Sequence, residues 1–216
     1  MELMNLKIRP ARKDDAGFLS QIIVTAGRAH VKKGIWEVIL GETEEKCLYF
    51  LRELSVTKIP HYFHYSCYLV AEVDGLTAAG LGGYDPAVLG NSALWQALPD
   101  VVSNLRSGAA FQSGGNEPPK ILSCIPDPVE GAWVIDSVAA FQQFRRKGIV
   151  SMLLEEIIEI GRHQGFKLAQ INIYIGNIAA QRLYEKHGFR IIDEIRDSYF
   201  ESQIGSPGMA CMVRNI

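Results

Sequence analysis

Residues 133–154 read Trp133-Val134-Ile135-Asp136-Ser137-Val138-Ala139-Ala140-Phe141-Gln142-Gln143-Phe144-Arg145-Arg146-Lys147-Gly148-Ile149-Val150-Ser151-Met152-Leu153-Leu154. The first eight of these residues are mostly apolar, which is typical of a buried strand. After the basic loop, apolar residues recur every three or four positions from Ile149 to Ile160 and predict a helix that ends near Gly165. The sequence therefore predicts a strand that leads through a basic loop into a helix.

The loop places three cations, Arg145, Arg146 and Lys147, at the N-terminus of the predicted helix. The helix dipole favours anions at this end and penalises cations, so a bound anion would resolve the conflict. Gly148 lets the backbone approach closely, and the unpaired N–H groups of the first turn would form a phosphate cradle. Taken alone, the segment is interpreted equally well as a solvated basic turn.

A second informative segment follows one strand later. The strand is expected at Leu168 to Ile175, and the segment reads Asn177-Ile178-Ala179-Ala180-Gln181-Arg182-Leu183-Tyr184-Glu185-Lys186-His187-Gly188-Phe189. Asn177 is predicted to cap a helix that Gly188 ends, and Tyr184 lies in the apolar stripe of that helix. Taken alone, Tyr184 is best interpreted as an aromatic residue at the edge of the core with a hydrogen-bonded hydroxyl.

Together the two segments resemble the GNAT superfamily of N-acetyltransferases. The loop from Arg145 to Gly148 is similar to the motif R/Q-x-x-G-x-G/A, with Val150 at the position that is usually glycine or alanine. We expect Val150 to crowd the approach to the pyrophosphate. The second segment matches every named position of N-x-x-A-x-x-L-Y-x-x-x-G-F. The resemblance is close over about Trp133 to Ile195, whereas the N-terminal half shares only the order of its elements.

The resemblance implies an α/β fold, in which helices flank a mixed, mostly antiparallel sheet in an α/β/α sandwich over residues 1–216. It implies an N-acetyltransferase that uses acetyl-CoA and no metal, and in which an amine attacks the acetyl group directly in a ternary complex. The implied cofactor-binding residues are Val138, Ala139, Ala140, Arg145, Arg146, Lys147, Gly148, Ile149, Val150, Asn177 and Tyr184. Tyr184 is also the implied general acid, since a phenol of pKa ~10 can donate a proton to a CoA thiolate whose parent thiol has pKa ~8.5.

The general base that deprotonates the acceptor is expected at Asp136, on the strand that leads to the loop. This strand is otherwise apolar, so partial burial would raise the carboxyl pKa toward a useful range. Relatives often carry a carboxylate at this position. A carboxylate satisfied by hydrogen bonds at the sheet edge is an equally good interpretation.

The segment Pro60-His61-Tyr62-Phe63-His64-Tyr65 is expected to line the acceptor side of the cleft. Either His61 or His64 could then bind the substrate and serve as the base, while the aromatic residues shape the pocket. Two histidines without a third ligand are a weak signal for a metal. The alternative interpretation is a set of packing aromatics with exposed histidines.

An insertion at about residues 85–131 separates two strands that a short turn usually joins in this family. Leu94 to Leu105 are predicted to form a short helix, and Ser113 to Pro119 a loop. The apolar residues between Ala93 and Val102 are too numerous for a solvated segment. The helix is therefore expected to pack over the acceptor side of the cleft and set specificity, or else to form a homodimer contact.

Charge and composition argue against several other classes of protein. The 22 basic and 24 acidic side chains leave a formal charge of −2, so no global basic field attracts nucleic acid or a membrane surface. The four cysteines lie far apart and are expected to be reduced thiols of a cytoplasmic protein. No signal peptide and no apolar run of ~20 residues is visible. Neither a P-loop nor a dinucleotide-binding glycine motif is present.

The sequence supports two functional hypotheses of different classes. The first is acetylation of an amine, either a small molecule or a peptide. The second is a non-catalytic acyl-CoA-binding sensor, whose affinity for a partner would change with the cofactor without any transfer. The acceptor itself is left open, because specificity in this fold resides in its variable segments.

Overall fold

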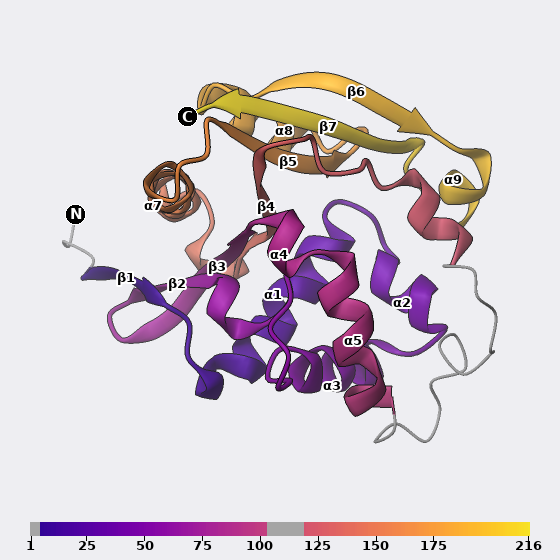
Figure 1. The fold of residues 1–216 in the computed structure, drawn as a ribbon, viewed down its shortest axis with the longest axis horizontal. Coiled ribbons are helices and arrows are strands. Elements are labelled where there is room, and N and C mark those ends of the chain that lie inside the picture. The colour runs from indigo at the N-terminus through magenta and orange to yellow at the C-terminus, as the bar shows by residue number, and fades with distance from the viewer. Residues whose placement is uncertain (1–4, 103–118) are drawn as a thin grey trace.

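A computed structural model describes residues 5–102 and 119–216, and within them helices flank one seven-stranded sheet of order β1-β2-β3-β4-β5-β7-β6 (Figure 1). The strands are β1 (Leu6–Pro10), β2 (Tyr68–Val73), β3 (Leu76–Tyr84), β4 (Ala132–Ala140), β5 (Leu168–Tyr174), β6 (Arg190–Arg196) and β7 (Gly208–Asn215). The helices are α1 (Ala16–Arg28), α2 (Ile35–Leu40), α3 (Glu44–Leu54), α4 (Pro86–Leu89), α5 (Asn91–Val102), α7 (Ile149–His163), α8 (Ile178–Lys186) and α9 (Ser198–Ile204). This architecture confirms the predicted fold class.

The sheet divides between β4 and β5, which are its parallel pair in the described residues. Ala132–Ile135 of β4 pairs with Leu168–Ile171 of β5. Beyond Ile135, β4 stays paired with β3 as far as Ala140, while β5 stays paired with β7 as far as Tyr174. The two strands therefore diverge, and side chains from both line the opening between them.

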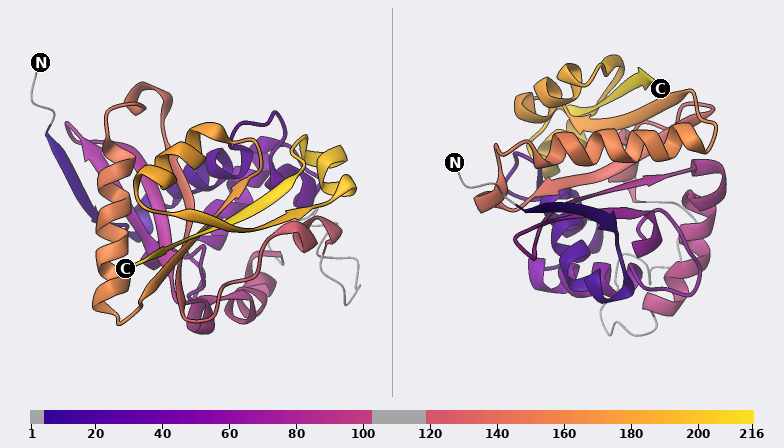
Figure 2. Two further views of the ribbon diagram at one scale, coloured as in Figure 1. Left: turned by 90° about the horizontal axis from the view of Figure 1, so that it is seen from above. Right: turned by 90° about the vertical axis from the view of Figure 1, so that its left-hand side faces the viewer.

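Alternate residues of β2 point into two separate hydrophobic cores. Tyr68 and Val70 join the core that contains residues of α1, α2 and α3, whereas Leu69 and Ala71 join the core that contains α7. Because side chains alternate across a strand, the two cores lie on opposite faces of the sheet. Figure 2 shows α7 and the N-terminal helices on different sides of the strands.

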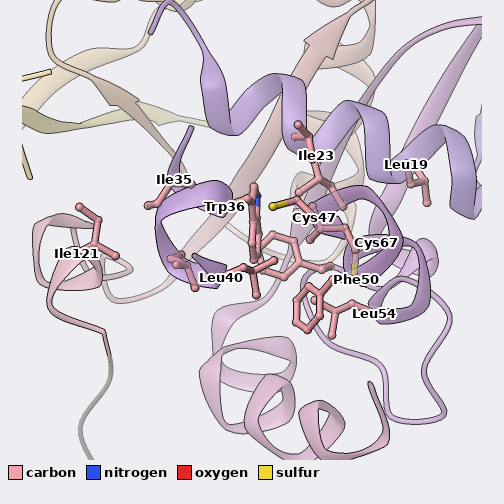
Figure 3. Packing of buried hydrophobic residues seen from close by; sticks show 14 of the residues in the cluster. Leu19, Ile23, Ile35, Trp36, Leu40, Cys47, Phe50, Leu54, Cys67 and Ile121 are labelled. Atoms are coloured by element: carbon pink, nitrogen blue, oxygen red, sulfur yellow. The ribbon is translucent and has the colours of Figure 1, made fainter. Parts of the chain in front are cut away.

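The N-terminal core joins three helices through aromatic side chains (Figure 3). Trp36 of α2 and Phe50 of α3 lie close to α1, with their ring centroids 6.5 Å apart. Trp36 also contacts Phe63, at 5.0 Å between centroids. This packing orders one wall of the cavity described below.

Three local predictions are confirmed. The dipeptide Asp74-Gly75 is a strong sequence signal for a hairpin turn, and its φ angles are 51° and 81°, as a two-residue hairpin turn requires. The Asn177 side chain accepts a hydrogen bond from the Ala180 N–H at 3.3 Å and caps α8. Gly188 follows the end of that helix with φ of 81°.

The sequence predicts that Asp14 or Asp15 caps the first helix. Asp15 is the N-cap residue of α1, but its side chain makes no capping hydrogen bond. The Asp15 carboxylate instead accepts the Arg12 N–H at 2.7 Å and pairs with Arg9. An ion pair with the first strand therefore takes the place of the expected cap.

Three short helices, α2, α4 and α9, are not predicted from the sequence pattern. Each has too few residues to show an amphipathic period. The Glu37 carboxylate orders the start of α2, because it accepts the Gly34 N–H at 2.7 Å and pairs with Arg28. Asp197 caps α9 by accepting the Phe200 N–H at 2.6 Å.

The segment between β3 and β4 contains the expected short helix. It is α5, which runs from Asn91 to Val102 instead of from Leu94 to Leu105. Residues 103–105 of that prediction, and residues 113–118 of the expected loop, lie outside the described residues. In the part of the chain that the structure describes, no helix is both long and apolar enough to cross a bilayer.

Candidate active site

A cavity of about 1010 Å³ occupies the opening between β4 and β5. Its loop end is lined by residues of the segments 144–151 and 177–184. Its aromatic end is lined by residues of α1, α2, α3 and α5, and by the rings of Trp36, Tyr62, Phe63, Tyr84 and Trp95. Asp136 belongs to the strand that both ends share.

A β-bulge shapes β4 where it borders the cavity. Gly80 of β3 lies opposite Ala139, and Gly82 lies opposite Asp136, so β4 has one more residue than β3 between these pairs. Ser137, inside the bulge, has the left-handed φ of 53°. Because a bulge interrupts the ladder, it leaves backbone groups of β4 unpaired next to the cavity.

The Asp136 carboxyl group is held at the bulge and lines the cavity. It accepts the Ser137 N–H at 2.5 Å. Burial raises its pKa above the ordinary value, although the hydrogen bonds from Ser137 oppose this. Asp136 is therefore a stronger base than an exposed carboxylate.

The Asp136 carboxylate affects the pKa of several nearby tyrosine hydroxyls. Burial is the main cause of the raised pKa of Tyr62, Tyr84 and Tyr184, and the nearby Asp136 carboxylate raises each pKa further. Tyr184 comes from α8, is 5% exposed and lines the cavity. The structure thus brings Tyr184 and Asp136, the two predicted catalytic residues, to one cavity.

The basic loop has the conformation of an anion site. Gly148 is the N-cap of α7 with φ of 78°, and no side chain caps this helix. The N–H groups of Ile149 and Val150 therefore have no partner within the helix, and both residues line the cavity. The Arg145 Nε donates to the Ala140 carbonyl at 3.0 Å, which ties the loop to the end of β4.

Most of the predicted cofactor-binding residues line the cavity. Those that do are Val138, Ala139, Ala140, Arg145, Arg146, Gly148, Ile149, Val150, Asn177 and Tyr184. Lys147 does not, and its Nζ lies 5.5 Å from the centroid of the Phe144 ring. Val150 is partly buried and packs against the core that contains α7.

The predicted substrate-binding histidines, His61 and His64, are buried and do not line the cavity. His61 Nδ1 accepts the Phe63 N–H at 3.1 Å, which leaves Nε2 to donate to Thr57 Oγ1 at 3.1 Å. Burial, assisted by His64, lowers the pKa of His61 to about 4. Both histidines therefore have local structural contacts, and the alternative of exposed histidines is wrong.

Sequence reasoning missed which neighbours of these histidines reach the cavity. Tyr62 and Phe63 line it, and Tyr62 stacks on Tyr84 with 5.1 Å between ring centroids. The aromatic run was the available signal, but the direction of each ring depends on tertiary packing. Within residues 5–102 and 119–216, no group of three or more His, Cys, Asp or Glu side chains is arranged to bind a metal.

A hydrogen-bonded chain behind the loop was also missed. His187 Nδ1 lies 2.6 Å from Glu155, and His187 Nε2 lies 2.9 Å from the Ser151 hydroxyl. Ser151 lies in the first turn of α7 and lines the cavity. These residues come from two helices, so their spacing in the sequence gave no signal.

Residues 114–189 match the model of the acetyltransferase (GNAT) family. This part of the chain is similar to GNAT acetyltransferases. The matched residues include β4, the basic loop, α7, β5 and α8, and so confirm the resemblance predicted from the sequence. The match supports acetyl transfer from acetyl-CoA as the class of activity. Among curated proteins, none matches the chain.

Similarity in fold to solved acetyltransferases extends over nearly the full length of the chain. A crystal structure described as an acetyltransferase is 20% identical, with a TM-score of 0.66 over 97% of this chain and 99% of that chain. An N-acetyltransferase from Staphylococcus aureus is 19% identical, with a TM-score of 0.64 over 96% and 99%. The PaiA N-acetyltransferase from Thermoplasma acidophilum, in complex with coenzyme A, is 12% identical, with a TM-score of 0.51 over 99% and 100%.

Proposed function

We propose that the protein is an N-acetyltransferase that transfers the acetyl group of acetyl-CoA directly to an amine in a ternary complex. One observation carries this proposal: the basic loop, Asp136 and Tyr184 line one continuous cavity. The loop end suits an anionic cofactor, and the aromatic end leaves room for an acceptor. The carboxyl and phenol groups face the same space.

The loop end fits the pyrophosphate of acetyl-CoA. Arg145 and Arg146 supply positive charge, and the first-turn N–H groups of α7 supply hydrogen-bond donors. The bulged backbone around Val138 supplies further polar groups along β4. When bound, acetyl-CoA provides an electrophilic thioester carbonyl.

Asp136 and Tyr184 account for the proton transfers that such a reaction requires. A C–N bond forms and the C–S bond breaks, so an ammonium acceptor loses two protons and the sulfur gains one. Asp136 accepts the proton that leaves before attack and passes it to solvent. Tyr184 donates a proton to the sulfur and regains one from the nitrogen as the amide forms. The raised pKa of Tyr184 keeps its phenol protonated at neutral pH.

The cysteines support direct attack over an acyl-cysteine route. All four are free and buried, and none lines the cavity. Burial raises the pKa of Cys47, Cys67 and Cys211 to about 11, so these thiols stay protonated at neutral pH.

The cytoplasmic location and the homodimer stay predictions from the sequence.

An amine screen tests this function against the sensor alternative. The protein would be incubated with acetyl-CoA and mixed primary amines, while free CoA thiol and acetylated products are measured. We expect thiol release that depends on an amine and is matched by an acetylated product. Calorimetric binding of acetyl-CoA without transfer to any amine would favour the acyl-CoA-binding sensor instead.

A further inference from the structure

We infer that the acceptor is a monocationic amine attached to an aromatic or similarly flat apolar body, without a carboxylate. This inference rests on the proposed function and assigns a substrate class to the aromatic end of the cavity. Three features carry it: the rings that form the walls, the position of the negative charge, and the distribution of cations along the lining.

The walls of the aromatic end are a packed set of rings. Tyr62 and Tyr84 are stacked, with 5.1 Å between centroids and 20° between planes. Phe63 lies 4.3 Å from Tyr62 and 5.0 Å from Trp36, measured between centroids. Aliphatic side chains from α1, α2 and α5, among them Leu94, complete the lining. Such a surface gains free energy by burying an apolar body and gains little from a hydroxyl-rich one.

The negative charge is placed where an ammonium head would meet it. Asp136 lines the cavity at the strand shared by its two ends, close to the rings of Tyr62 and Tyr84. Aromatic faces and a carboxylate both attract a cation, and the attraction strengthens in a site with little water. An ammonium group bound beside Asp136 would also lie next to its proton acceptor.

The cations of the cavity lie at the loop end. Among the described lining residues, the arginine and lysine side chains are those of Arg145 and Arg146, and both belong to the basic loop. Asp127 also lines the cavity, but it is exposed and its carboxylate is negatively charged, like that of Asp136. Within the described part of the lining, a substrate carboxylate buried among the rings would therefore find no cation to pair with, and an unpaired buried charge is strongly unfavourable.

A matched pair of substrates isolates the carboxylate. 2-Phenylethylamine and L-phenylalanine have the same ring and amine and differ by one carboxylate, while L-phenylalaninamide replaces it with an uncharged group. We expect kcat/KM for 2-phenylethylamine to exceed that for L-phenylalanine by about 100-fold or more, with L-phenylalaninamide in between. Equal or faster turnover of L-phenylalanine, of spermidine or of a serine-initiated peptide would overturn the inference.

A matched pair of variants tests the walls. Tyr62 and Tyr65 are both half-buried tyrosines, three residues apart, but Tyr65 does not line the cavity. We expect Tyr62→Leu to raise KM for 2-phenylethylamine about tenfold and Tyr65→Leu to leave it unchanged. The same KM in both variants, each with its melting temperature checked, would contradict the assignment.

Direct binding separates failure of this inference from failure of the proposed function. Calorimetry with CoA-saturated protein measures amine affinity without any reaction. If 2-phenylethylamine binds and L-phenylalanine does not, while no amine is acetylated, the ligand class assigned to the aromatic end stands and the proposed catalysis fails. If acetylation occurs but favours spermidine or a peptide, the catalysis stands and the inference fails.

Discussion

The His187 ring lies 2.9 Å from the Ser151 hydroxyl through Nε2, and so joins the C-terminal end of α8 to the first turn of α7. The Glu155 carboxylate lies 2.6 Å from His187 Nδ1 and also forms an ion pair with Arg214. Burial opposes ionisation of Glu155, but the hydrogen bonds from His187 and Arg214 outweigh it and lower the carboxyl pKa. These hydrogen bonds, from Glu155 through His187, therefore orient the Ser151 hydroxyl in the first turn of α7, where we propose that the pyrophosphate binds.

Removing this histidine is expected to weaken CoA binding. His187→Ala should raise the Kd of CoA about 5- to 10-fold, since a single hydrogen bond is worth about 1 kcal/mol. Calorimetry with CoA and with pantetheine, which lacks the pyrophosphate, measures the effect. His163→Ala, on an exposed histidine of α7, is the control. Equal loss for both ligands would mean that His187 only holds α8 against α7.

The basic loop is expected to recognise phosphate through Arg145 more than through Lys147. Both substitutions to glutamate change the charge equally, but only Arg145 lines the cavity. Arg145→Glu should abolish most of the rise in melting temperature that CoA produces, because a ligand stabilises only the state that it binds. Lys147→Glu should reduce this rise only slightly. Equal losses would show that the overall charge of the loop matters and not the position of Arg145.

Tyr184 is expected to act in chemistry and not in cofactor binding. Tyr184→Phe should lower kcat by ~10²-fold and leave acetyl-CoA affinity nearly unchanged, as expected for the loss of a general acid. Steady-state kinetics from pH 6 to 10 and calorimetry provide the two readouts. Unchanged turnover over that range would leave Tyr184 as a packing residue.

Asp136 is expected to lower stability while it supports activity. Its pKa is raised on folding, so the folded state binds more protons than the unfolded state between the two pKa values. Stability therefore falls as pH rises through that window, and the cost persists at neutral pH. Asp136→Asn should raise the melting temperature at pH 7, by about 2–4 °C for each kcal/mol relieved, and lower kcat by ~10²-fold. A lower melting temperature, or full activity, would contradict this account.

His61 is expected to make the protein sensitive to acid. Its pKa is lowered from 6.5 to about 4, so the unfolded state takes up the proton first. The contribution of neutral His61 to the free energy of unfolding is fully present above pH 6.5 and is lost as the pH falls toward 4. That loss amounts to about 3 kcal/mol. His61→Gln should flatten the dependence of melting temperature on pH over this interval, whereas His163→Gln should not. An unchanged slope in His61→Gln would assign the acid sensitivity to other groups.

The elements near the loop were predicted well because their signals are local. Asn177 and Gly188 bound α8 as expected, and the strand predicted from Trp133 to Ala140 is β4 (Ala132–Ala140). The helices α2 and α9 escaped prediction because short segments have no period. Their ends depend on Glu37 and Asp197.

By itself the sequence determined the basic loop, the helix that follows it and the cap of α8, because each depends on backbone conformations and hydrogen bonds within a few residues. The tertiary structure alone decided that Asp136, Tyr184 and Tyr62 face one cavity, since they come from β4, α8 and the segment before β2. It also decided that Tyr62 lines the cavity while His61 is buried against Thr57. The direction of each side chain in a loop depends on packing against residues that are distant in the sequence, and no local pattern specifies those residues.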